Sequence, residues 1–146
     1  MLHFSLESRA FNLYVVKSNL MKNISPDTRK HPELYRIGQG DEGALTYEPY
    51  KSELLPLLRF KSPTIAKESA ANIHRMFVAY KKDSDFVGMD MARKYLQMGL
   101  ARARTYSQEN SEFAEAAKLF REVSLKAKRD PYYIVLKAKH QRLFER

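Results

Sequence analysis

The sequence predicts a mainly helical, single-domain protein: a bundle of about four helices with a short N-terminal β-hairpin or small sheet, an α+β arrangement. Two observations lead to this fold class. Beyond residue 62, four stretches repeat apolar residues at helical spacing, and capping residues or prolines mark where they begin. Before residue 48, glycines separate two short apolar runs, which is typical of a hairpin.

The 146 residues are the size of one domain. We divide it into a strand and hairpin region (1–47), a connector (48–62) and a helical region (63–146). Cysteine is absent, which excludes disulfides and thiolate metal ligands and is compatible with a reducing cytosol. No apolar run is long enough to span a membrane or has the features of a targeting segment. We therefore expect a cytoplasmic protein with no membrane partner.

The hairpin region begins with alternating apolar residues over 2–6, which favour a strand, although a helical stripe also fits 6–20. Residues 34–37 and 44–47 are the two predicted strands around a glycine turn. The glycines formally match G-x-G-x-x-G, but a dinucleotide loop must open a helix, and the residues that follow are strand-like and end at a proline. Two carboxylates in the turn would also repel a pyrophosphate, so we expect no cofactor.

Each predicted helix has a residue that suits its N-cap, where a short polar side chain accepts a hydrogen bond from the first turn. In chain order these residues are Ser62, Asp83 or Asp85, Ser111 and Asp130. A proline follows the first and the last, at the position where a helix tolerates proline best. The turn after the first helix is short, so helices 62–82 and 85–106 should pack antiparallel at the centre, closed over by the C-terminal pair.

The helix over 85–106 has two different faces at about 100° per residue. One broad side carries the cations Arg93, Lys94, Arg102 and Arg104. The opposite arc is apolar and includes Gly88 and Gly99, each of which costs about 1 kcal/mol of helix stability relative to alanine. We therefore expect these glycines to let a neighbouring helix approach closely.

The charge of the chain is strongly positive and uneven. The formal net charge is +9 and the pI is near 9.7. Residues 1–85 hold 13 Lys and Arg against 10 Asp and Glu, a net of +3, whereas residues 86–146 hold 13 against 7, a net of +6. Such an excess favours polyanionic partners, nucleic acid first.

Nucleic-acid binding is the predicted function, through phosphate contacts from the basic side of the helix 85–106. The predicted phosphate-binding residues are Arg93, Lys94, Arg102 and Arg104 on this helix and Lys51, Arg59 and Lys61 on the connector. The predicted stacking residues for unpaired bases are Tyr50 and Tyr106. In the competing interpretation, the arginines pair with carboxylates inside the fold and the tyrosines belong to the core.

Two other classes of function fit the same residues. An adaptor that docks on an acidic protein would use the cations together with methionines as adaptable surface. An enzyme acting on a phosphorylated small molecule would use arginines as an anion clamp, in a pocket gathering Glu48, Arg59 and Arg93. We favour a binding protein, because no catalytic motif is present and the Asp90 and Lys94 pair suits an ordinary helix surface. No histidine spacing indicates a metal site.

Three blocks of the chain resemble a known family. They are HPELYRIGQGDEG (31–43), EPYKSELLPLLRFKSP (48–63) and DFVGMDMARKYLQMGLARARTY (85–106). They are similar to blocks of a family from bacteria, fungi and tailed phages that is known only as a domain of unknown function, with members often labelled cytoplasmic. The resemblance covers about residues 31–106 and, more weakly, the C-terminal helices, and it implies no reaction. The blocks are rich in charged residues, which suits a site for an anionic ligand better than a purely structural module.

Overall fold

The structure, a computed structural model, describes residues 26–145. The strand predicted over 2–6, and the alternative helix over 6–20, lie outside the described residues. Within 26–145, no helix is both long enough and apolar enough to cross a membrane.

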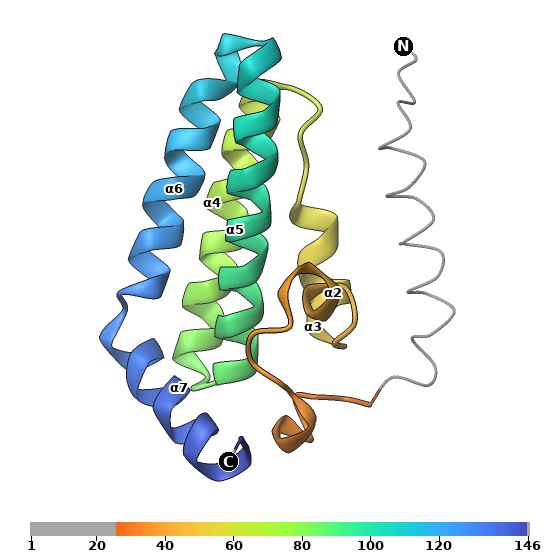
Figure 1. The fold of residues 1–146 in the computed structure, drawn as a ribbon, viewed down its shortest axis with the longest axis vertical. Coiled ribbons are helices and arrows are strands. Elements are labelled where there is room, and N and C mark those ends of the chain that lie inside the picture. The colour runs from red at the N-terminus through yellow and green to blue at the C-terminus, as the bar shows by residue number, and fades with distance from the viewer. Residues whose placement is uncertain (1–25, 146) are drawn as a thin grey trace.

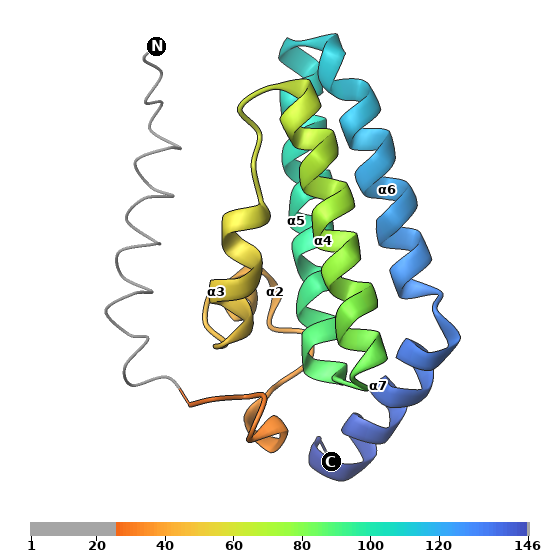
Figure 2. The ribbon, with the colours of Figure 1, turned by 180° about the vertical axis from the view of Figure 1, so that it is seen from behind.

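Three long helices lie side by side and form the body of the fold (Figure 1). They are α4 (Pro63–Lys82), α5 (Phe86–Glu109) and α6 (Ala114–Lys128). As predicted, α4 and α5 run antiparallel. Of the C-terminal pair, α6 packs along both central helices, whereas α7 (Pro131–Phe144) covers only one end of them. On the side away from α6, α5 is covered by α2 (Gly40–Ala44) and α3 (Tyr50–Leu54) (Figure 2).

The helix starts follow the local signals in the sequence. Ser62 caps α4, since its Oγ accepts a hydrogen bond from the Ile65 amide at 3.1 Å. Asp85 caps α5 and Asp130 caps α7 in the same way. The third start differs: Asn110 caps a 3₁₀ turn over Ser111–Phe113, and α6 follows this turn directly, without a side-chain cap of its own. The predictions at Ser62, Asp85 and Asp130 are therefore confirmed.

The predicted hairpin is wrong, and so is the count of about four helices. Residues 26–145 contain six α-helices and no strand, and their one β-type contact is an isolated bridge between Asp27 and Glu48. A 3₁₀ turn precedes Tyr35, and the second predicted strand overlaps the end of α2. Tyr35 and Ala44 are fully buried among core side chains, so these segments pack separately against the bundle and do not pair with each other.

The apolar arc of α5 forms the centre of the core, with Met89, Ala92, Tyr95 and Leu96 fully buried. Glycine allows a close helix contact there, as predicted. A β-carbon at Gly88 would lie 2.4 Å from the ring of Tyr80 on α4, closer than van der Waals contact permits. Gly99 makes the same kind of contact with α6.

Candidate functional site

Three of the predicted phosphate-binding cations point into the fold. Lys51 is buried, with its Nζ 3.5 Å from Glu48 Oε2. Lys94 is also buried, and its Nζ lies 5.1 Å from the centroid of the Tyr35 ring. The side chain of Arg93 is only 14% exposed, and its Nε donates to the Tyr133 hydroxyl at 2.8 Å. None of the three is placed to contact an external phosphate backbone.

Arg93 and Lys94 belong to a buried polar group, the Asp90 cluster, which consists of Asp90, Arg93, Lys94, Tyr35 and Tyr133. Asp90 is fully buried. Its two carboxylate oxygens accept hydrogen bonds from the Tyr35 and Tyr133 hydroxyls, both at 2.5 Å. Burial, and then the Asp90 charge, raise the pKa of both tyrosines, so the hydroxyls remain donors. The cluster thus joins α5 to α7 and to the segment before α2.

Two buried polar atoms have no hydrogen-bond partner among the described residues: Lys94 Nζ, within the Asp90 cluster, and Glu145 Oε2, outside it. Burial lowers the pKa of Lys94, while its attraction to Asp90 works in the opposite direction. The other oxygen of Glu145 accepts from the Ile37 amide at 3.1 Å, and His140 Nε2 lies 3.0 Å from the Tyr35 carbonyl oxygen. These contacts fix the end of α7 against residues 35–37, which is a structural role.

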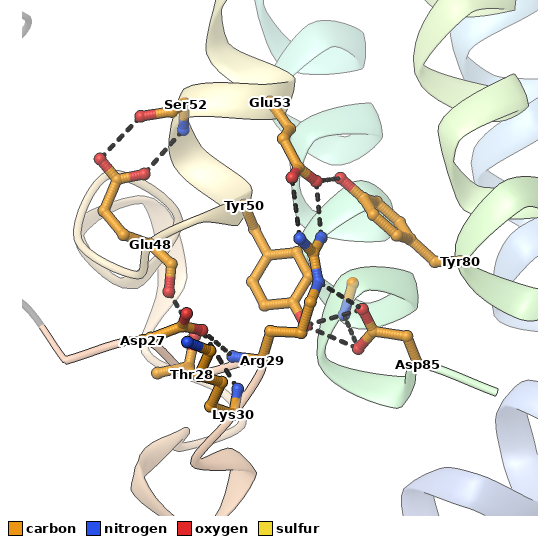
Figure 3. A network of polar contacts seen from close by, with 11 residues as sticks. Asp27, Thr28, Arg29, Lys30, Glu48, Tyr50, Ser52, Glu53, Tyr80 and Asp85 are labelled. Atoms are coloured by element: carbon orange, nitrogen blue, oxygen red, sulfur yellow. Dashed lines mark hydrogen bonds and ion pairs between the residues drawn. The ribbon is translucent and has the colours of Figure 1, made fainter. Parts of the chain in front are cut away.

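A second polar group, the Arg29 network, consists of Arg29, Glu53, Asp85, Tyr50 and Tyr80 (Figure 3). The Arg29 guanidinium forms a bidentate ion pair with the Glu53 carboxylate, with hydrogen bonds of 3.0 and 2.7 Å. Its Nε also donates to the Asp85 carboxylate at 3.4 Å. Tyr50 and Tyr80 donate to Asp85 and Glu53, each at 2.7 Å. Tyr50, a predicted stacking residue, is fully buried in this network and presents no ring surface to a base. Arg29 was not among the predicted site residues.

The Glu53 carboxylate should make folding stability depend on acid pH. Burial alone would raise its pKa, but hydrogen bonds from Arg29 and Tyr80 outweigh burial and hold the pKa below 4.5. A carboxyl whose pKa is lower in the folded state stabilises the fold above its unfolded value, and that contribution is lost as pH falls below 4.5.

We therefore expect Glu53→Gln to lower the free energy of unfolding by about 2 kcal/mol at pH 7. The variant should also lose less stability than the parent between pH 4.5 and pH 3, measured by urea unfolding at each pH. Glu68→Gln, at an exposed residue of α4, is the control and should change neither quantity. Equal acid sensitivity of parent and Glu53→Gln would contradict this assignment.

The remaining predicted site residues lie near the surface. Arg59, Lys61 and Arg104 are exposed, and Arg102 and Tyr106 are half-buried. Phe60 brings several of them together: the Arg102 guanidinium lies 5.6 Å from its ring centroid, and Tyr106 stacks on it at 5.7 Å. Arg104, two residues along α5 from Arg102, lies about 200° around the helix and so on another side.

Within residues 26–145, the largest concentration of exposed cations is on α6, which was not part of the predicted site. We call it the α6 basic surface, and it consists of Lys118, Arg121, Lys126, Lys128 and Arg129. All five are exposed, and none forms an ion pair with a described residue. Over residues 118–142 the chain holds eight Lys and Arg against two Asp and Glu, a net of +6. A sliding count of net charge would have found this stretch.

The three residues of the enzyme alternative have different hydrogen-bond partners. Glu48 accepts from Ser52, the Arg59 amide donates to Ser69, and the Arg93 side chain belongs to the Asp90 cluster. Among residues 26–145, no three His, Asp or Glu side chains come together in a way that could hold a metal ion.

The chain matches the model of a known protein family. Residues 19–112, more than half of the chain, match the model of a domain of unknown function, DUF4385. The chain belongs to this family. The resemblance to an uncharacterised family is thus confirmed, and the DUF4385 match includes the Arg29 network and all of α5 but ends before α6. No curated protein and no solved structure matches the chain significantly.

Proposed function

We propose that this DUF4385 protein binds nucleic acid in the cytoplasm, through phosphate contacts made by the α6 basic surface. The observation that carries the proposal is the position of the excess charge. The net of +6 in residues 86–146 equals the net of +6 in 118–142, so the remainder of the C-terminal half is balanced. The excess charge of the C-terminal half therefore lies on α6 and α7.

The five cations of the α6 basic surface share one side of the helix. At about 100° per residue they fall within an arc of about 160°, which a phosphate backbone can follow. Two carboxylates of α6, Glu115 and Glu122, also lie on this arc, and Glu115 pairs with Lys67 at 3.5 Å. Arg59, Lys61 and Arg104, the exposed members of the predicted site, would add to the long-range attraction. Association of this kind is steered by charge and weakened by salt.

The salt dependence of binding tests the proposal. For five phosphate contacts on duplex DNA, we expect log K to fall with log salt at a slope of about −4 to −5. Neutralising three cations, in Lys126→Gln/Lys128→Gln/Arg129→Gln, should reduce that slope by about 3 and weaken binding at every salt concentration. The measurement is fluorescence anisotropy with labelled DNA and RNA at several salt concentrations.

A matched variant tests which surface binds nucleic acid, and the unmodified protein tests whether it binds at all. Arg59→Gln/Lys61→Gln/Arg104→Gln removes the same charge from the exposed part of the originally predicted site. We expect it to weaken binding less than the α6 variant. If it weakens binding more, the connector and α5 form the site. If the unmodified protein binds neither DNA nor RNA at low salt, the nucleic-acid function itself is wrong.

An adaptor function is the second candidate, favoured by apolar side chains on the outside of α7. Ile134 is 52% exposed and Val135 is 61% exposed, next to the exposed cation Lys139. Large exposed apolar residues flanked by cations suit an acidic protein partner better than a phosphate backbone. Capture of an acidic protein from nuclease-treated lysate, lost in Val135→Glu, would support this function over the first.

A further inference from the structure

An open cavity of about 400 Å³ lies between α7 and the turn that joins α4 to α5. Three separate parts of the chain form it: residues 29–32, residues 83–87 and the second half of α7. The volume falls within the range of about 300–1,000 Å³ that small-molecule sites occupy. The cavity is separate from the α6 basic surface, so what it binds does not depend on the proposed function.

The walls of the cavity are mostly apolar. The apolar lining residues are Pro32, Phe86, Val87, Leu136, Leu143 and Phe144. The ring of His140 completes this surface, 5.1 Å from the Phe86 ring and 4.9 Å from the Phe144 ring. Leu143 is 55% exposed and forms part of the rim. Such walls suit the hydrocarbon or aromatic part of a ligand.

The polar groups of the lining offer more hydrogen-bond donors than acceptors. Lys139 is exposed and makes no ion pair with a described residue. Arg29 uses three of its five N–H groups on Glu53 and Asp85, which leaves two for a ligand. The Asp85 carboxylate already accepts from Tyr50, Arg29 and Gly88. Asp83, at the exposed end of α4, is the one lining carboxylate without a side-chain partner among residues 26–145.

The geometry points to a binding site for a small amphipathic carboxylate, with its apolar part between Phe86, Leu136 and Phe144 and its carboxylate near Lys139. An ammonium and a guanidinium at the rim bind a carboxylate through charge-assisted hydrogen bonds, which are stronger than bonds between neutral groups. Burial of the apolar part supplies the rest of the affinity. Asp83 keeps the rim from becoming a general anion site and favours ligands with a single negative charge.

The test titrates the full-length, ¹⁵N-labelled protein with 4-phenylbutyrate and with its uncharged analogue 4-phenylbutan-1-ol. We expect saturable amide shifts confined to residues 29–32, 83–87 and 136–144, and binding of the alcohol about tenfold weaker. Lys139→Gln should weaken binding of the carboxylate about tenfold and leave binding of the alcohol unchanged. Leu136→Trp, which fills the cavity, should abolish both.

Two variants at exposed residues distinguish a loss of ligand binding from a loss of folding. Leu143→Glu places a negative charge on the exposed rim and should weaken the carboxylate more than the alcohol, without disturbing the core. Val78→Glu makes the same kind of change at an exposed apolar residue of α4 that does not line the cavity, and it should bind like the parent. Absence of saturable shifts, shifts outside the three segments, or equal binding of acid and alcohol would each overturn the proposal.

Discussion

Replacing Asp90 with alanine is expected to destabilise the fold by about 3–5 kcal/mol. Asp90 is fully buried and accepts hydrogen bonds from the Tyr35 and Tyr133 hydroxyls, with Arg93 Nε at 3.6 Å and Lys94 Nζ at 3.9 Å. Alanine would leave the buried Lys94 and the largely buried Arg93 without their counter-charge, and two hydroxyls without an acceptor. A buried charge that loses its partner costs far more than an exposed ion pair contributes.

Urea unfolding of Asp90→Ala measures this loss as a lower midpoint with an unchanged slope. Asp41→Ala is the matched control, because Asp41 is an exposed aspartate of α2, and its replacement should change stability by less than about 0.5 kcal/mol. Asp90→Asn separates the effect of charge from that of shape, because it keeps one acceptor oxygen but removes the counter-charge. Its loss of stability should therefore be smaller than that of Asp90→Ala but larger than that of Asp41→Ala. If Asp90→Ala and Asp41→Ala lost equal stability, the Asp90 cluster would have no structural role.

The helices could be predicted because their signals are local. A cap residue such as Ser62 and the proline after it lie within one turn of the helix that they start, so the contact that fixes the boundary is visible in four residues of sequence. The apolar arc of α5 was visible for the same reason, since one face of a helix repeats every three to four residues.

The region before α3 could not be predicted in this way, because short apolar runs beside glycines fit more than one local structure. Gly38 and Gly40 do adopt positive φ, at 83° and 61°, but the turn leads into α2 and not into a second strand. The deciding contacts are distant: the Tyr95 hydroxyl on α5 donates to the carbonyl oxygen of Ala44, 51 residues earlier. Tertiary packing of this kind overrides weak strand propensity.

The same limit applies to the candidate site. Helical spacing places Arg93, Lys94 and Arg104 outside the apolar arc of α5, but spacing does not reveal which other segments cover that side. Tyr133, 43 residues after Asp90, covers Arg93, and Tyr35 covers Lys94. Arg104 remains exposed because neither segment reaches that part of α5. The pairing of arginines with acids inside the fold, which the sequence left open, therefore applies to Arg93 and not to Arg104.

Gly99→Ala is expected to destabilise the protein by about 2 kcal/mol, although alanine is the better helix former by about 1 kcal/mol. A β-carbon at residue 99 would lie 2.1 Å from Cε1 of Phe120 and 2.6 Å from its Cδ1. The Phe120 ring is fully buried and packs against Phe60 at 5.7 Å, so it has little room to move. The steric cost should therefore exceed the gain in helix propensity.

A double-mutant cycle attributes this cost to the α5–α6 contact. Phe120→Leu makes room at the ring, so Gly99→Ala should cost at least about 0.5 kcal/mol less in that background than in the parent. Ala101→Gly, at an exposed residue of the same helix, measures propensity alone and should cost about 1 kcal/mol. Stabilisation by Gly99→Ala would mean that α5 and α6 can separate freely at this point. The close approach through Gly99 would then not fix the position of α6, the helix that carries the proposed nucleic-acid surface.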